Sequence, residues 1–301
     1  MDKSSIDFFK QLFENVDNQI NAFTEMLSEL SECMFELFYH WRRQADSVIV
    51  EEADAIAQCM FQMMICKVRS IIQLSKGVSV MPERPDLRIP DIPSMAAIVR
   101  SMYELEFVFH NIFVEQPTKA ERNIILYLWE IKGLNNRQGL QLVPPEHKVQ
   151  EEKEKGQIQD LRNAIASTIE EMDMSDRVKK QIKKAINTNG TNIKGYRFVK
   201  DDEGQIIAFQ DYYFADGNDD LLRNNHPDTY KFLSFVSHPS YISVLQFGQM
   251  YDKREDRNQL RTILAESFQL ASLMCVDFVN GIPGAKEVFD RLPNEKKSVI
   301  R

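Results

Sequence analysis

Residues 16–41 read VDNQINAFTEMLSELSECMFELFYHW, and this stretch has the clearest helical periodicity in the chain. Its apolar residues alternate between spacings of four and three positions, the heptad pattern of a helix with one buried seam. The seam comprises Val16, Ile20, Phe23, Leu27, Leu30, Met34, Leu37 and Trp41, and Phe9 extends it toward the N-terminus. The pattern predicts one helix over residues 5–44, about 60 Å long at 1.5 Å per residue.

A helix of that length needs a long partner for its seam. Residues 48–76 offer one, because Ala53, Ile56, Met60, Met63, Ile71 and Leu74 recur at helical spacing. Gly77 marks a plausible end, since glycine is the usual residue just after a helix. Together the two segments predict a long helical hairpin or half of a dimer interface. The Met-rich run Cys59–Cys66 within it is read as core, with a partner surface as the alternative.

Further along the chain, most segments again have helical periodicity. Pro-rich residues 77–94 predict an extended connection, Ser94 caps a helix that runs to about residue 113, and Thr118–Glu121 forms a capping box for a helix over 119–133. A charged stretch over 144–190 predicts two helices, the second capped by Ser175 and ended by Asn189-Gly190. Residues 195–214 predict a β-hairpin around Asp201–Gly204 that must pack on helices. Helices follow over 227–238, 240–251 and 256–280, and a loose tail follows Pro293.

The predicted fold is therefore all-α: a long N-terminal helical hairpin packed on a helical bundle, with one small β-hairpin insertion. Its segments are residues 1–76, the hairpin; 77–143, the proline-rich connection and core helices; 144–190, a charged helical insertion; and 191–301, the C-terminal helical part of the same domain. A chain of 301 residues with 43% hydrophobic content can bury such a core without disulfides.

Charge and cysteine content narrow the classes of function. The net charge of −8 disfavours general coating of nucleic-acid phosphates, which is driven by Lys and Arg, but it leaves room for a local basic groove. Cys33, Cys59, Cys66 and Cys275 form no CxxC pair and are predicted to be buried free thiols in a reducing cytoplasm. No signal-peptide pattern and no uninterrupted apolar run of membrane-spanning length is present, so the prediction is a cytoplasmic protein without a membrane span.

Two short polar signatures lie in otherwise apolar helical segments. Arg100 and Glu104 are one turn apart on a helix that is apolar on most sides, so an arginine there needs a partner and Glu104 is within reach. The pair is either an ordinary intrahelical ion pair or an arginine held in a cleft. Ser234 and His238 are also one turn apart, before Pro239. His238 is either a capping histidine or a general acid or base, and a Ser234–His238 nucleophile pair is the weaker alternative because no nucleophile elbow surrounds Ser234.

Other polar clusters favour plainer interpretations. Glu32, Glu36 and His40 share one helix face, and a solvated stripe is preferred over a metal site because the Glu-x-x-His spacing of di-iron bundles is missing. The basic cluster between Arg177 and Lys184 could contact phosphate, but the acidic residues beside it argue against nucleic acid. The sequence therefore predicts neither a metal nor another cofactor.

The motifs Arg100-Ser-Met-Tyr-Glu104 and Ser234-Phe-Val-Ser-His238-Pro239 resemble those of a family of uncharacterised helical bacterial proteins. That family has a helix with Arg-Ser/Thr-Leu-x-Glu and, later in the chain, a Ser-x-x-x-His-Pro/Gly stretch, and the resemblance covers residues 50–280. That family is distantly similar to the helical nucleotide-binding and ribonuclease modules of toxin and phage-defence systems. Those modules carry Arg-x(4–6)-His on one helix. Here Arg100 and His110 are too far apart for that motif, and Arg223 and His226 are too close together.

Two functional classes follow from these residues and the resemblance. The first prediction is a non-catalytic scaffold or sensor in stress or phage defence, with a homodimer formed through helical surfaces. The alternative is a metal-free enzyme acting on RNA or a nucleotide, in which Arg100, Glu104, Ser234 and His238 meet in one cleft, Arg100 steadies phosphate and His238 acts as acid or base. A metal-dependent helical bundle is a minor third class.

Overall fold

The structure, a computed structural model, describes residues 15–44, 51–79, 81, 83–84, 88–139, 144, 148–187, 194–213, 228–252 and 255–299. These ranges confirm the all-α fold class with a small β-hairpin insertion. The chain divides into two compact units. Unit 1 comprises residues 1–109 and 219–301, and unit 2 comprises residues 110–218. The predicted charged segment 144–190 and the β-hairpin both belong to unit 2.

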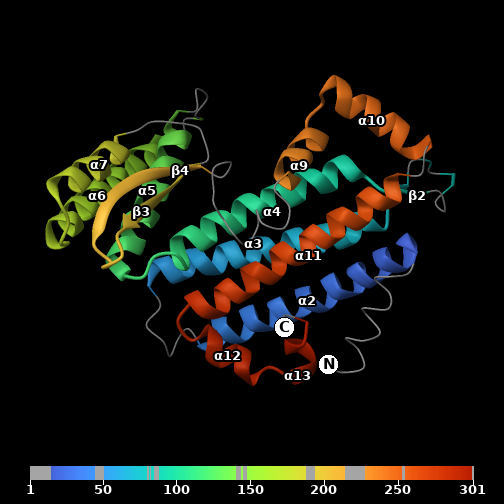
Figure 1. The fold of residues 1–301 in the computed structure, drawn as a ribbon, viewed down its shortest axis with the longest axis horizontal. Coiled ribbons are helices and arrows are strands. Elements are labelled where there is room, and N and C mark those ends of the chain that lie inside the picture. Colours follow the sequence, from blue (N-terminus) through green and yellow to red (C-terminus); the bar gives the residue numbers. More distant parts are fainter. Residues whose placement is uncertain are drawn as a thin grey trace. The chain divides into compact units, whose positions relative to one another are not determined.

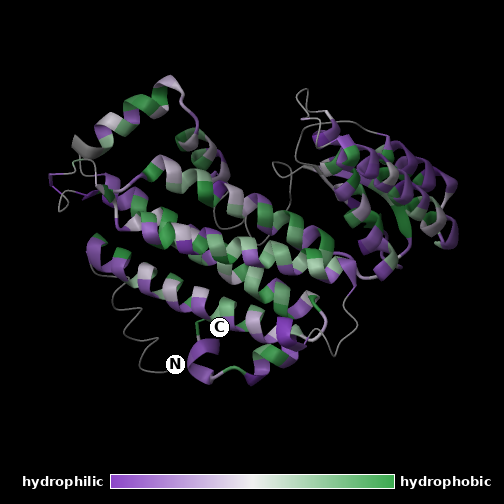
Figure 2. Ribbon diagram, turned by 180° about the vertical axis from the view of Figure 1, so that it is seen from behind, coloured by the Kyte–Doolittle hydropathy of each residue, from purple (hydrophilic) through white to green (hydrophobic). Residues whose placement is uncertain are grey.

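Unit 1 is built around long helices that run side by side (Figure 1). They are α2 (Val16–Gln44), α3 (Glu52–Ser75), α4 (Ile92–Phe113), whose last turn crosses into unit 2, and α11 (Asp256–Gly281). Helices α2, α3 and α11 contact one another pairwise. Figure 2 shows hydrophobic residues concentrated on α3, α4 and α11. The helices therefore share one apolar core.

The core of unit 1 uses the predicted seam within the chain itself. Leu27, Leu30, Met34 and Leu37 are fully buried and Trp41 is nearly so. Trp41 packs edge-on against Phe278, 5.6 Å between ring centroids, and its Nε1 donates to the Pro283 carbonyl over 2.9 Å. The seam is thus filled by α3, α11 and the chain beyond α11, and it is not a free dimer surface. The predicted helical residues 5–14, including Phe9, lie outside the described residues.

Shorter elements complete unit 1. Two-residue strands β1 (Val78–Ser79) and β2 (Arg88–Ile89) pair antiparallel within the Pro-rich connection. Gly77, with φ of 78°, ends α3 as predicted, and a Cβ there would lie 3.0 Å from the Cβ of Arg88. The remaining helices are α9 (Thr229–Ser237), α10 (Tyr241–Asp252), α12 (Ala285–Arg291) and α13 (Asn294–Lys297).

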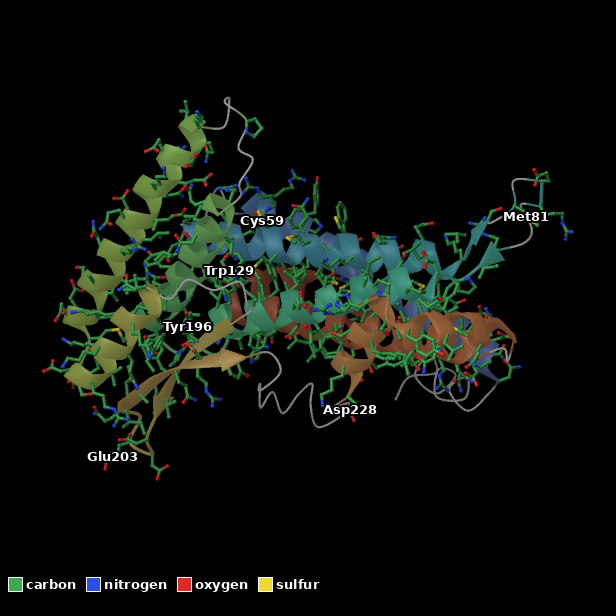
Figure 3. The ribbon with its side chains drawn as sticks, turned by 90° about the horizontal axis from the view of Figure 1, so that it is seen from above. Cys59, Met81, Trp129, Tyr196, Glu203 and Asp228 are labelled. Atoms are coloured by element: carbon green, nitrogen blue, oxygen red, sulfur yellow. The ribbon has the colours of Figure 1, made fainter. Side chains whose placement is uncertain are left out.

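Unit 2 is a helical layer that carries the β-hairpin. Its helices are α5 (Lys119–Gln138), α6 (Lys148–Glu171) and α7 (Asp176–Ile186), and its strands are β3 (Lys194–Lys200) and β4 (Ile206–Tyr213). The hairpin packs on α5 and α7, where the Gln181 side chain accepts from the Phe209 backbone N–H over 2.9 Å. Glu203 lies at the tip of this hairpin (Figure 3). The outer faces of α6 and α7 are largely hydrophilic (Figure 2).

Several predicted boundaries need correction. Helix α4 begins at Ile92 because the Asp91 carboxylate, not Ser94, caps it and accepts from the Ser94 backbone N–H over 3.2 Å. Helix α5 continues to Gln138, five residues beyond its predicted end. The tail after Pro293 contains the short helix α13. The caps at Thr118 and Ser175 are present, since each side chain accepts a backbone N–H one turn on.

Helices α3 and α11 are both long and apolar enough to span a bilayer by length and composition alone. In the most apolar 18-residue window of each helix, 44% of the window is buried inside the protein for α3 and 56% for α11. Core helices of soluble proteins meet the same criterion, so this composition is compatible with a soluble protein.

Candidate functional site

One face of α4 carries polar side chains between its buried apolar rows. Arg100 and Glu104 lie one turn apart, with 3.4 Å between Arg100 Nε and Glu104 Oε1. Their side chains are 27% and 24% exposed, so the pair lies at the edge of the core and retains contact with solvent. The predicted ion pair is therefore present, but it is one part of a larger network.

Tyr230, in the first turn of α9, joins both charges. Its hydroxyl donates to Glu104 Oε1 over 2.9 Å and accepts from Arg100 Nε over 3.3 Å. The guanidinium carbon of Arg100 also lies 5.4 Å from the centroid of the Tyr230 ring, within cation–π range. Asp228, just before α9, is labelled in Figure 3 and locates the start of this helix. The tyrosine thus fixes the orientation of the guanidinium plane.

His238 follows the last residue of α9 and contacts the same arginine. Its Nε2 lies 2.6 Å from Arg100 Nη1. Because arginine has only donors, Nε2 is the acceptor in this contact and the ring is neutral, with its proton on Nδ1. The backbone carbonyl of His238 accepts from the Ser243 hydroxyl and the Ser240 N–H, which holds the turn before α10. The imidazole itself is exposed.

Lys67 of α3 brings another positive charge to α4. Its Nζ donates to the Ser101 hydroxyl over 2.6 Å, and that hydroxyl donates to the Ile98 carbonyl. Partial burial lowers the pKa of Lys67, and the negative charge of Glu104 opposes that shift. The hydrogen bond with Tyr230 raises the pKa of Arg100, although burial opposes it. Arg100 stays charged, and Lys67 loses its proton more easily than an exposed lysine.

A buried hydrogen bond lies beneath this surface network. Tyr103, one residue before Glu104, donates to Glu266 of α11 over 2.5 Å, and both side chains are buried. Burial and the adjacent Glu266 carboxylate raise the pKa of the Tyr103 hydroxyl. The rings of Tyr103 and Tyr230 meet edge to face with 6.4 Å between centroids. The position of α9 is therefore tied through Tyr103 to the central helix α11.

The predicted site residues differ in where the structure places them. Arg100, Glu104 and His238 come together, although 138 positions separate Arg100 from His238. Ser234 lies on α9, but within the described residues its hydroxyl makes no hydrogen bond to this network; its carbonyl accepts from Ser237. Tyr230 and Lys67 also belong to the network and were not predicted from the sequence. The position of Tyr230, two helical turns before His238, is the one sequence feature that could have indicated it. No sequence pattern distinguishes Lys67 from a solvated lysine.

The other predicted clusters have structural partners. Glu36 accepts from Lys296, so this carboxylate of the Glu32, Glu36 and His40 stripe is engaged in an ion pair. Lys179 and Lys183 both pair with Glu170, which neutralises part of the basic cluster between Arg177 and Lys184. Arg223 and His226 lie outside the described residues.

The Met-rich run of α3 is only partly core. Met60 and Met64 are buried, whereas Met63 is 51% exposed, which corrects its predicted place in the core. Cys59 and Cys66 are also exposed, so the prediction of four buried thiols is wrong for these two.

The network assembles a fixed cation, a neutral imidazole and a carboxylate on an exposed surface. Arg100 uses Nε and Nη1 in the contacts above, and no contact among the described residues uses its Nη2. Such an arrangement can hold an anion beside a histidine that accepts or donates a proton. No family model, curated protein or solved structure matches this chain.

Proposed function

We propose that unit 1 is a metal-free enzyme that cleaves a phosphodiester bond of RNA at the Arg100–His238 pair. The observation that carries this proposal is the 2.6 Å contact between Arg100 Nη1 and His238 Nε2 on an exposed face. An imidazole exposed to solvent beside an arginine suits phosphate chemistry, because it combines an acid–base group with a donor to phosphate oxygens. The family that the two motifs resemble is distantly similar to ribonuclease modules of defence systems, although this chain lacks their Arg-x(4–6)-His motif and would have to bring Arg100 and His238 together from two helices instead.

In the first step, a phosphate of the RNA binds to Arg100. Nη2 and the solvent side of the guanidinium offer donors with the geometry that phosphate oxygens accept in pairs. A charged phosphate competes with the neutral imidazole for Nη1, because hydrogen bonds to an anion are the stronger ones. Glu104 and Tyr230 hold Nε and keep the guanidinium in place. Substrate binding thereby releases Nε2 of His238.

In the second step, the released Nε2 takes the proton of the neighbouring ribose 2′-hydroxyl. The 2′-oxygen attacks phosphorus, the bond from phosphorus to the 5′-oxygen breaks, and a 2′,3′-cyclic phosphate forms. The 5′-oxygen leaves with the proton carried by His238, so atoms and charge balance without another reactant. Arg100 stabilises the charge on the non-bridging oxygens in the transition state.

The test is cleavage of a mixed RNA pool in the presence of a chelator. We expect His238→Ala to lower the rate by about 100-fold or more, the usual contribution of a general acid–base group. His40→Ala is the matched control, since His40 is an exposed histidine on α2, outside the network, and its loss leaves the rate unchanged. A 2′-deoxy nucleotide at the cleaved position abolishes the reaction. A folded wild-type protein that cleaves no RNA in the pool contradicts the enzyme proposal.

The second candidate is the non-catalytic scaffold or sensor, and one observation favours it. Glu104 already balances the charge of Arg100, and Tyr230 joins α4 to α9, as expected of a network that only holds helices together. In that case the folded wild type cleaves no RNA, and His238→Ala only shifts thermal unfolding. Metal-dependent bundle chemistry is the third and least favoured class.

We also propose that the protein acts in the bacterial cytoplasm, in stress or phage defence. Free thiols at all four cysteines fit a reducing compartment. The biological setting comes from the family resemblance at the two motifs. Loss of protection against phage when His238→Ala replaces the wild-type gene would support this setting.

A further inference from the structure

The face of α2 opposite the buried seam has an ordered distribution of charge. Glu25, Glu29 and Glu32 occupy its N-terminal part, Phe35 and Tyr39 its middle, and Arg42 and Arg43 its C-terminal part. We call these seven residues the outer face of α2. All of them are exposed. The face therefore runs from acidic through aromatic to basic along one straight helix.

The aromatic middle is unusual for a solvated helix surface. Phe35 is 51% exposed and Tyr39 is 45% exposed. Their rings are stacked with 6.3 Å between centroids, and the Tyr39 hydroxyl accepts from Arg43 Nη1. Aromatic residues are enriched at the centres of protein interfaces, where they bury much area with little loss of conformational entropy. This pair is suited to the centre of a contact.

The charge order makes the outer face complementary to itself. When a second copy of α2 lies antiparallel across it, about a two-fold axis between Phe35 and Tyr39, Phe35 of one copy faces Tyr39 of the other. The same axis places Arg42 opposite Glu32, because both lie five positions from the midpoint at residue 37. A two-fold axis repeats each contact, so every basic end meets an acidic end. A parallel arrangement would instead bring like charges together.

A groove beside the acidic end provides room for the basic end. It has a volume of about 570 Å³ and is lined by Glu29, Glu32 and Glu295, with Lys296 and other residues of the α13 region. Lys296 is already paired with Glu36. Arg42 and Arg43 of a second copy carry the charge that this groove lacks, and the long arginine side chain can reach into it.

We propose that the outer face of α2 binds a second copy of this chain, forming an antiparallel, two-fold symmetric dimer. The buried seam of α2 takes no part in it, because that seam is filled within one chain. The interface instead uses the aromatic pair as its apolar centre and two sets of arginine–glutamate contacts at its ends. The dimer is independent of the RNA cleavage proposed above.

Charge reversal on one or both ends of the face tests this arrangement by sedimentation velocity. We expect the wild type to form a dimer at micromolar concentration. Arg42→Glu with Arg43→Glu, or Glu29→Arg with Glu32→Arg, places like charges at both ends and raises the dissociation constant by about 100-fold. An equimolar mixture of these two variants forms a heterodimer, because each supplies the charge that the other lacks. A chain with all four reversals forms a homodimer again.

The mixture also serves as the control for folding, since only folded variants restore the dimer. Tyr39→Ser weakens the wild-type dimer without changing any charge. A monomeric wild type at micromolar concentration overturns the proposal. So does a dimer that persists unchanged in both one-sided reversals, because it must then form through another surface.

Discussion

Tyr230 shows how one neutral side chain organises the charges of the candidate site. Its hydroxyl has one proton, which it gives to Glu104, and its lone pairs accept from Arg100. Burial raises the pKa of this hydroxyl, and Glu104 adds to that effect while Arg100 opposes it. The tyrosine therefore keeps its proton and bridges the carboxylate of Glu104 and the guanidinium of Arg100.

Cys33 and Cys275 are buried, whereas Cys59 and Cys66 are exposed. Their reactivities therefore test how the helices pack. Burial raises the pKa of Cys33 to about 11, with Glu36 adding to the shift and Lys296 opposing it. Burial also raises the pKa of Cys275 well above its ordinary value. Because the thiolate is the reactive form, we expect Cys59 and Cys66 to react quickly with a thiol reagent at mildly alkaline pH and the other two only after unfolding.

The measurement compares native and denatured protein in a chromogenic thiol assay. Cys59→Ser with Cys66→Ser removes the fast phase and leaves the slow one. Rapid reaction of all four thiols in the native protein contradicts the packing of α2 against α11.

Arg100, Glu104 and His238 could be predicted from the sequence because polar groups in apolar helices need partners. Tyr230 and Lys67 were beyond prediction, since a tyrosine or lysine at a helix surface is ordinary until the neighbouring helix is placed. The prediction of Ser234 rests only on its spacing of one turn from His238, and spacing on a helix does not say which side chains face another helix.

At the scale of elements, α6 is held to α5 by a carboxylate with several donors. Glu154 of α6 is buried and accepts from Gln150, Gln138 and Arg137. Burial alone would raise the pKa of Glu154, but these hydrogen bonds outweigh it and hold the pKa below its ordinary value. The contact between the two helices therefore depends on the ionised form of this group.

The lowered pKa of Glu154 determines how the stability of unit 2 changes with pH. Glu154 contributes stability above its ordinary pKa, and that contribution is lost as pH falls through its lower, folded-state pKa. We expect Glu154→Gln to destabilise unit 2 at neutral pH and to flatten the loss of stability on acidification, measured by urea unfolding across the acid range. Glu152→Gln on the same helix is the control, because Glu152 pairs with Lys155 in solvent. Parallel pH profiles for wild type and Glu154→Gln would refute this role.

Strongly periodic elements were the predictable ones. Helices α2 and α11 follow from their apolar spacing alone, and α11 ends one residue from the predicted position. The helices α12 and α13 and the β1–β2 pair were missed because each is too short for periodicity to appear. The start of α4 was misplaced because Asp91 and Ser94 are equally good caps by residue type, and only the backbone path decides between them.

At the scale of the molecule, two apolar cores form in one chain. Leu264 of α11 is fully buried in unit 1 and Ile165 of α6 is fully buried in unit 2. Since each unit has its own core, we expect two unfolding transitions in scanning calorimetry. Leu264→Ala and Ile165→Ala each cost about 2–5 kcal/mol, and each lowers only the transition of its own unit. A single transition that both variants lower alike would show that the units unfold as one.

Unit 1 is formed by two stretches of the sequence that flank unit 2, and this order affects the folding of the nascent chain. Helices α2 and α3 leave the ribosome early, but α11, which contacts both, is made only after all of unit 2. The Trp41–Pro283 hydrogen bond closes a loop of 242 positions. Unit 2 can therefore reach its native structure during synthesis. The methionine-, leucine- and phenylalanine-rich surfaces of α2 and α3 meanwhile remain uncovered until α11 has been made. That interval is when the chain is most exposed to aggregation and to chaperones that bind apolar helices.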